Sequence, residues 1–213
     1  MHTFDVPVRM LRSDKPVGRW SLDELTDSSE VRAMAYSAMS AEGFEVQRIC
    51  ERMQLRPEAS ATQSDRYPHV HQLLFWQAAE SVSGDPDIGL RICRSLPLLR
   101  AGVMSYLMLS SPSIRHAVLA LAECSHLISD GLELKIDESG AEASLQINAS
   151  PLSSPHMRHT EICMAYTMMK FLSVGMSQPI KPVGVAFQCK PIAPLAEYES
   201  VFGCPVVLAR VEN

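Results

Sequence analysis

The sequence predicts an α+β domain in which an N-terminal helical part is followed by a small sheet packed against helices. Between residues 29 and 128 apolar residues recur at helical spacing, interrupted by glycine, proline and serine. After Gly131 the pattern changes to alternation of apolar and polar residues, which is typical of half-buried strands. Helical segments then separate the later strand-like segments. Helices followed by strands with helices laid against them indicate the α+β class.

The first 27 residues differ from the rest of the chain. They mix prolines, a glycine and charged residues without a hydrophobic period. We therefore expect an N-terminal extension over residues 1–27 and one domain over residues 28–213. A chain of 213 residues that is 46% hydrophobic and 20% charged can bury a full core within one large domain.

The helical part is expected to consist of short helices whose ends are marked by particular residues. Glycine is favoured just past a helix end, so Gly43 ends the first helix and Gly84 the third. Proline is tolerated in a first turn, so Pro68 opens the third helix, and Asp85 is placed to cap the fourth. The expected helices cover residues 29–43, 44–53, 68–84, 85–96, 101–109 and 117–128.

The last two of these helices are separated by the segment "SSPS". Pro112 has no backbone N–H group to donate, and it disfavours the helical conformation at Ser111. The hydroxyl of Ser111 or Ser113 can then cap the next helix. This segment is expected to fold two apolar helices back on each other.

The sheet is expected in the C-terminal part of the chain. "LELKID" and "ASLQIN" alternate with period two around "ESGAE", which predicts a hairpin. A helix over about residues 154–174 is apolar around most of its circumference and is expected to be central. Beyond it, "PIKPVGVAFQCK" predicts a strand, "APLAEYESVF" a short helix and "GCPVVLARV" a closing strand.

Composition and charge exclude several classes of protein. The formal net charge of −5 argues against a chain that wraps nucleic-acid phosphates by itself. The six cysteines lie far apart and form no C-x-x-C motif, so we expect neither a zinc ribbon nor a redox motif. We find no leader pattern and no apolar run long enough to span a bilayer. A cytoplasmic, reduced location without membrane contact is expected.

One Glu-x-x-His pair keeps an alternative function open. Glu123 and His126 have the spacing used in di-metal helix bundles, but such sites need a second copy and carboxylates from other helices. No second copy is present in the sequence. The alternative is a metal-dependent or Cys/His-based enzyme or sensor that uses His126, Glu123 and Cys124.

The other histidine pairs and the known catalytic motifs give no site. His69 and His71 would share a face only in a strand, and their context is a helix start. His156 and His159 have helical spacing but no accompanying acidic triad. No G-x-S-x-G, G-x-x-x-x-G-K-[ST] or G-x-G-x-x-G segment occurs. We therefore expect no catalytic residue, no metal ligand and no cofactor.

The most apolar helices are rich in methionine and carry side chains with polar tips. Flexible thioethers fill irregular cores, and they also line adaptable ligand pockets. Tyrosine, tryptophan and histidine can orient a small ligand within an apolar cavity. The alternative is that the same residues fill a packed core. The residues expected to bind a ligand are Trp76, Met104, Tyr106, Met108, Cys124, His126, Met164, Tyr166 and Met168.

Four short motifs occur in order over residues 29–213. They are "GDP" at 84–86, "LSSP" at 109–112, "SDG" at 129–131 and "FGCPV" at 202–206. As an ordered set they resemble the N-terminal effector-binding, arabinose-binding-like domain of AraC/XylS-type bacterial transcription regulators. In that family the "LSSP" turn is structural and not catalytic.

The resemblance implies a non-enzymatic function. It implies a ligand-sensing domain that binds a small-molecule effector, a metabolite or a fatty-acid-like molecule, in a largely apolar pocket. It also implies a homodimer and a C-terminal pair of helix-turn-helix motifs that hold DNA. The 213 residues end at "ARVEN", before any such motif. We therefore expect DNA to be bound only through a C-terminal domain absent from this chain.

Overall fold

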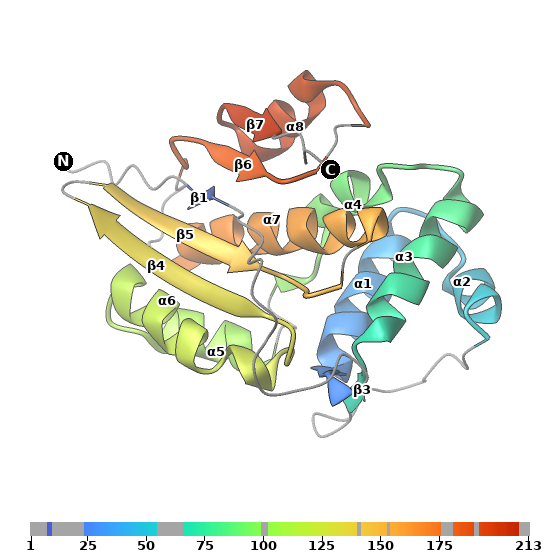
Figure 1. Ribbon diagram of the computed structural model, residues 1–213, viewed down its shortest axis with the longest axis horizontal. Helices are drawn as coiled ribbons and strands as arrows, with labels where there is room; N and C mark the ends of the chain where they lie inside the picture. Colours follow the sequence, from blue (N-terminus) through green and yellow to red (C-terminus); the bar gives the residue numbers. More distant parts are fainter. Residues whose placement is uncertain are drawn as a thin grey trace.

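The computed structural model has the α+β architecture that the sequence predicts (Figure 1). A helical part formed by the N-terminal half of the chain is joined by one long central helix to a sheet. The structure describes residues 8–9, 24–54, 66–98, 102–139, 142–152, 154–175, 181–189 and 192–208.

The helical part begins with α1 (Ser29–Ala41), α2 (Val46–Arg52), α3 (Val70–Ser83) and α4 (Ile88–Ile92). The residues at the ends of these helices determine where the helices start and stop. The Ser28 hydroxyl accepts from the backbone N–H of Glu30 and caps α1. α3 ends at Gly84, whose φ of 66° lies in the left-handed region that glycine enters without a steric penalty. Asp85 does not cap α4, contrary to the prediction. Its carboxylate accepts from the N–H of Asp87, and α4 starts after that turn.

A helical pair follows the 3-10 helix η2 (Cys93–Ser95) and comprises α5 (Val103–Ser110) and α6 (Ile114–Glu123). The "SSPS" segment separates them as predicted. Ser113 caps α6 by accepting from the N–H of His116, and Ser111 donates to the carbonyl of Leu107 in α5. A second 3-10 turn, η4 (Ser125–Leu127), ends this part.

The main sheet has five strands in the order β4-β5-β1-β6-β7. β4 pairs antiparallel with β5 as the predicted hairpin, with Ile136 opposite Leu145, and the other pairings are parallel. The strands are β1 (Val8–Arg9), β4 (Glu133–Ser139), β5 (Glu142–Asn148), β6 (Val185–Phe187) and β7 (Val206–Leu208).

Parts of the segment predicted as an extension pair with strands of the domain. β1 lies between β5 and β6 in the main sheet. β2 (Thr26–Ser28) pairs antiparallel with β3 (Arg66–Pro68) in a small second sheet, and Leu25 and Asp27 are buried there. These strands have two or three residues, too few to show the alternation that predicts a strand.

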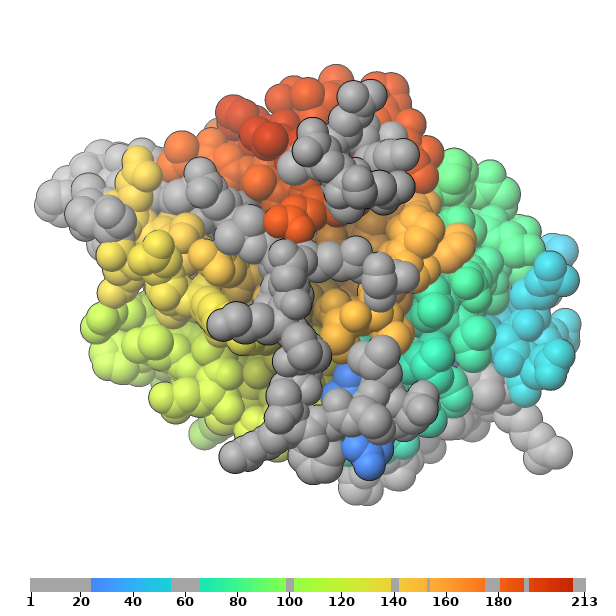
Figure 2. Space-filling model, in the orientation of Figure 1, coloured from blue at the N-terminus to red at the C-terminus, as the bar shows by residue number. Residues whose placement is uncertain are grey.

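α7 (Arg158–Gly175) is central, as its apolar circumference predicts, and it follows the 3-10 turn η5 (Pro155–Met157). It packs against α4, α5 and β5, and it buries Ile162, Met168 and Phe171. The C-terminal α8 (Leu195–Phe202) and β7 form a layer beyond β6. Figure 2 shows atoms of α7 and the segment before it between this layer and the helical part.

Replacing Ser113 by alanine is expected to lower the free energy of unfolding by about 1 kcal/mol, because the first turn of α6 loses its acceptor. Ser110→Ala is the control. The Ser110 hydroxyl donates only to the Tyr106 carbonyl within α5, so its loss should change stability by less than about 0.5 kcal/mol. Urea unfolding of both variants checks this, and equal losses would contradict the capping role.

Candidate functional site

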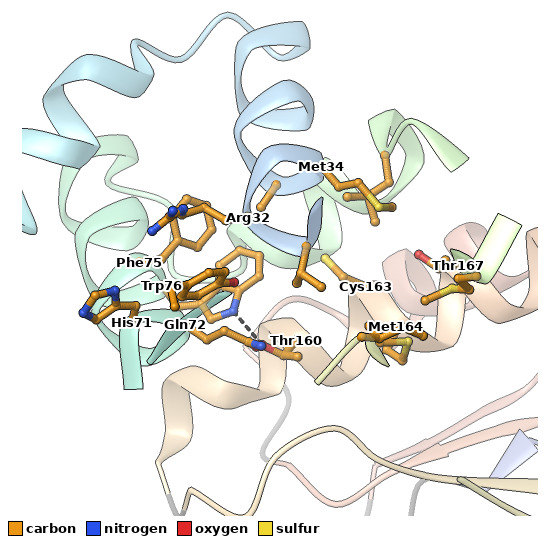
Figure 3. Close-up of a pocket in the computed structure, with 16 residues that line it drawn as sticks. Arg32, Met34, His71, Gln72, Phe75, Trp76, Thr160, Cys163, Met164 and Thr167 are labelled. Carbon is orange, nitrogen blue, oxygen red and sulfur yellow. Dashed lines mark hydrogen bonds between the residues drawn. The ribbon is translucent and has the colours of Figure 1, made fainter. Parts of the chain in front are cut away.

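A cavity lies where α1, α3 and α7 face one another (Figure 3). The space inside it that is open to the centres of water molecules is about 90 Å³. One water needs ~10–15 Å³ on that measure, so the cavity can hold several heavy atoms. We call it the α1–α3–α7 cavity. Tyr67 of β3, Leu96 after η2, Met104 of α5 and Ile128 after η4 also line it.

Helical spacing places the lining residues on single faces. On α3 these are His71, Gln72, Phe75 and Trp76, which recur at spacings of three and four residues. On α7 the lining residues are Thr160, Cys163, Met164 and Thr167, which share one face by the same rule. Each helix therefore presents one continuous row of side chains to the cavity.

The polar groups in this wall bind one another. The Trp76 indole N–H donates to Thr160 Oγ1 at 2.7 Å, and that hydroxyl donates to Gln72 Oε1 at 3.1 Å. Gln72 Nε2 in turn donates to Asp27 Oδ2 at 2.7 Å. These donors and acceptors are satisfied by one another and by Asp27 behind the wall. The surface that faces the cavity is therefore mainly apolar.

The hydrogen-bond chain continues away from the cavity. His69 Nδ1 lies 2.8 Å from Asp27 Oδ1, and His69 Nε2 lies 2.7 Å from Ser150 Oγ. Asp27 and His69 are both 0% exposed. We call the whole series, from Trp76 through Thr160, Gln72, Asp27 and His69 to Ser150, the buried polar chain.

The last three members have the order of a Ser-His-Asp catalytic triad, but the surroundings are those of a structural connection. None of Asp27, His69 and Ser150 lines the cavity. The ring of His69 is covered by Gly131, where a Cβ atom would lie 2.8 Å from Cε1. Ser150 Oγ also accepts from the N–H of Leu152. Ser150 is itself only 8% exposed.

A second polar cluster fixes the start of α7. Glu80 Oε1 accepts hydrogen bonds from His156 Nδ1, Arg158 Nη2 and His159 Nε2 at 2.8, 2.9 and 2.6 Å. His159 Nδ1 accepts from the backbone N–H of Gly89 at 3.2 Å. These contacts join α7 to the last turns of α3 and to α4.

The electrostatics of the cluster follow from burial. Burial and the neighbouring charge of Arg158 lower the pKa of His159 to about 4. The histidine is therefore neutral at pH 7, as its acceptance of the Gly89 N–H also requires. Burial raises the pKa of Glu80, but the hydrogen bonds from His156 and His159 and the Arg158 charge outweigh it and hold the pKa below its ordinary value.

Comparison with known proteins identifies the family. Residues 43–213 match the family described as the N-terminal arabinose-binding domain of the AraC transcription regulator. The chain belongs to this family. The resemblance found in the sequence is thereby confirmed, and AraC-type effector domains are regulatory and not enzymes.

One curated relative of this AraC-type domain is the ornithine utilization regulator of Pseudomonas aeruginosa. The two sequences are 24% identical over 164 residues, which cover 76% of this chain and 48% of the relative. The chain thus spans about half the length of that protein. In the described part of the chain, no helix combines the length and the apolar character needed to cross a membrane.

In this AraC-type domain, the predicted ligand-binding residues lie in three different environments. Trp76, Met104 and Met164 line the cavity. Three others are buried without lining it: Met108, Tyr166 and Met168. The remaining three lie outside: Tyr106 is 72% exposed, His126 is exposed and Cys124 is half-buried. Ligand binding by these residues stays a prediction.

Several lining residues were not selected from the sequence. Gln72, Phe75 and Thr160 belong to the cavity wall. Their helical spacing is visible in the sequence, but nothing local shows that α3 and α7 face each other. Selection by methionine content and by polar-tipped side chains favoured α5, α7 and the segment just after α6 instead.

The described residues contain no cluster of metal-binding side chains that would support the metal-dependent alternative. Glu123 and His126 are exposed, and Cys124 is half-buried. No group of three or more histidine, cysteine, aspartate or glutamate side chains in the described ranges could hold a metal ion. Burial raises the pKa of the Cys93 and Cys189 thiols to about 12, so both are protonated at neutral pH.

The free energy of unfolding should rise with pH between about 4 and 6.5. In this window the unfolded chain binds more protons than the folded chain, because the pKa of His159 is about 4 in the fold and 6.5 without it. The slope from this one group is at most about 1.4 kcal/mol per pH unit. The lowered pKa of Glu80 adds a further loss at the acid end.

Urea unfolding at a series of pH values checks this, with His159→Gln compared against His126→Gln, which changes an exposed histidine. We expect the slope to flatten in His159→Gln and to be retained in His126→Gln. If His159→Gln retains the slope of unfolding free energy against pH, the group that titrates is not His159.

Proposed function

We propose that this chain is the effector-sensing part of an AraC-type regulator and that a small molecule binds in the α1–α3–α7 cavity. Its binding would control a DNA-binding domain outside these 213 residues. The family assignment supports the regulatory role. The cavity, with its mainly apolar wall and few polar groups, has the composition of small-molecule sites.

The observation that carries the proposal is that one cavity is walled by three helices distant in sequence. A ligand there contacts α1 through Met34, α3 through Trp76 and α7 through Met164. A ligand shifts a conformational equilibrium only by its difference in affinity for the two arrangements. Contact with three separate helices gives the effector such a difference if they move relative to one another.

The remaining features of the proposal come from the family. We infer a cytoplasmic, bacterial homodimer whose DNA contacts lie in a helix-turn-helix part beyond this chain, as in whole AraC-type regulators. The net charge of −5 supports placing the DNA contacts elsewhere. The name of the Pseudomonas aeruginosa relative supports a metabolite as effector.

Two tryptophan substitutions on α7 test the cavity. Met164 is half-buried and lines it, whereas Met168, one turn further on, is 0% exposed and packed in the core. Met164→Trp should change stability little and abolish any effector-induced rise in Tm, because the rise follows from binding. Met168→Trp should cost about 1–3 kcal/mol by overpacking.

Thermal unfolding with a panel of metabolites and small carboxylates measures both effects. Strong destabilisation by Met164→Trp, together with no compound that shifts the wild-type Tm, would contradict the proposed effector site.

A further inference from the structure

The main sheet ends on one side in β4, a strand of seven residues, and on the other in β7, a strand of three. Natural sheets usually keep their edge strands short, because the backbone N–H and C=O groups along an edge can pair with a further strand. Within the described ranges β4 pairs with β5, and no backbone group outside β5 bonds to it. This edge therefore has the length and the backbone groups to pair with another strand.

The side chains on the outer face of β4 are charged. Successive side chains point to opposite faces of a strand, so Glu133, Lys135 and Asp137 share one face, and all three are exposed. The Lys135 ammonium lies 2.8 Å from Glu133 Oε1, and Asp137 forms no salt bridge within the described part of the chain. An ammonium has three N–H groups to donate, so Lys135 can bind a second carboxylate and still keep Glu133.

These charges favour one register for pairing with a second copy of β4. A two-fold axis perpendicular to the sheet keeps corresponding faces together only if it passes through a residue, because side chains alternate. An axis at Ile136 pairs all seven residues and places Lys135 opposite the partner's Asp137, twice because of the symmetry. Opposite charges at facing positions stabilise a strand pair.

The neighbouring registers place like charges opposite each other. An axis at Lys135 would set Glu133 against the partner's Asp137, and an axis at Asp137 would set that carboxylate against its own copy. Like charges directly opposite destabilise a strand pair. An axis nearer either end of β4 pairs fewer residues and so forms fewer backbone hydrogen bonds.

The inner face of β4, which α6 covers, fits the same register. Leu134 is buried, whereas Ile136 at the centre of the strand is half-buried. Pairing about Ile136 sets this side chain against the partner's Ile136 and removes apolar surface from water. Glu138, near the end of this face, is already neutralised by two hydrogen bonds of 2.9 Å from Arg115 of α6.

We propose that β4 forms the interface between two copies of this chain, which pair antiparallel about Ile136 and join their main sheets into one. Charges on an edge strand ordinarily prevent such pairing. The charges of β4 oppose the neighbouring registers and favour the one about Ile136. The proposal rests on the homodimer of the proposed function and names the surface that forms it.

A charge exchange tests the proposal, with the dimer Kd of the full chain measured at pH 7 by sedimentation velocity. Lys135→Glu and Asp137→Lys should each raise the Kd about ten-fold or more, because each turns two attractive pairs into two repulsive ones. The double variant Lys135→Glu/Asp137→Lys restores opposite charges at the facing positions. Its Kd should return to within about three-fold of the wild-type value.

Arg48→Glu is the control. Arg48 is exposed on α2, which lies far from β4 in Figure 1, so its charge reversal should leave the Kd unchanged. Circular dichroism shows whether each variant is folded. If Lys135→Glu does not fold, Asp137→Lys makes the same pair repulsive from the other side.

The contrary outcomes fall on different claims. An unchanged Kd in both single variants would overturn pairing through β4 and leave the inferred homodimer in place. Weakening in the single variants without recovery in the double variant would overturn the register about Ile136. A chain that stays monomeric would overturn both the interface and the homodimer. The effector site is measured separately, because a compound that raises the wild-type Tm should raise the Tm of these variants equally.

Discussion

The buried polar chain from Trp76 to Ser150 is the constraint on which the rest of the structure depends. It ties β2 through Asp27, α3 through Gln72 and Trp76, and α7 through Thr160. Asp27 is fully buried and held by two donors, so removal of either would leave part of a carboxylate unsatisfied in the interior. The same chain forms the polar edge of the cavity. One hydrogen-bond network therefore both joins β2, α3 and α7 and forms part of the cavity wall.

The cluster at Glu80 adds a second fixed point on the same helix. Arg158, His159 and Thr160 stand in the first turn of α7, and all three bond to residues of α3. Beyond this turn, α7 is held by apolar packing of residues such as Ile162 and Phe171. A ligand that touches Met164 and Thr167 acts just past the polar anchors.

The sequence predicts the fold class because its signals are local. Glycine at the end of α3, Ser113 before α6 and alternation in β4 and β5 each act over a few residues. The short strands β1, β2 and β3 escape prediction because their pairing is determined by partners far along the chain. The lining of the cavity was predicted less completely for the same reason. Apolar runs indicate which helices are buried, but the fold determines that Trp76 faces Thr160 while Tyr106 faces outward.

A crystal structure of this chain with a compound that raises its Tm tests the central claim most directly. The account predicts electron density for the compound in the α1–α3–α7 cavity, beside Trp76 and Met164. It also predicts that the bonds from Trp76 to Thr160 and on to Gln72 remain intact. Density at the cleft between α4 and α8, lined by Arg94 and Glu197, with the cavity left empty, would contradict it.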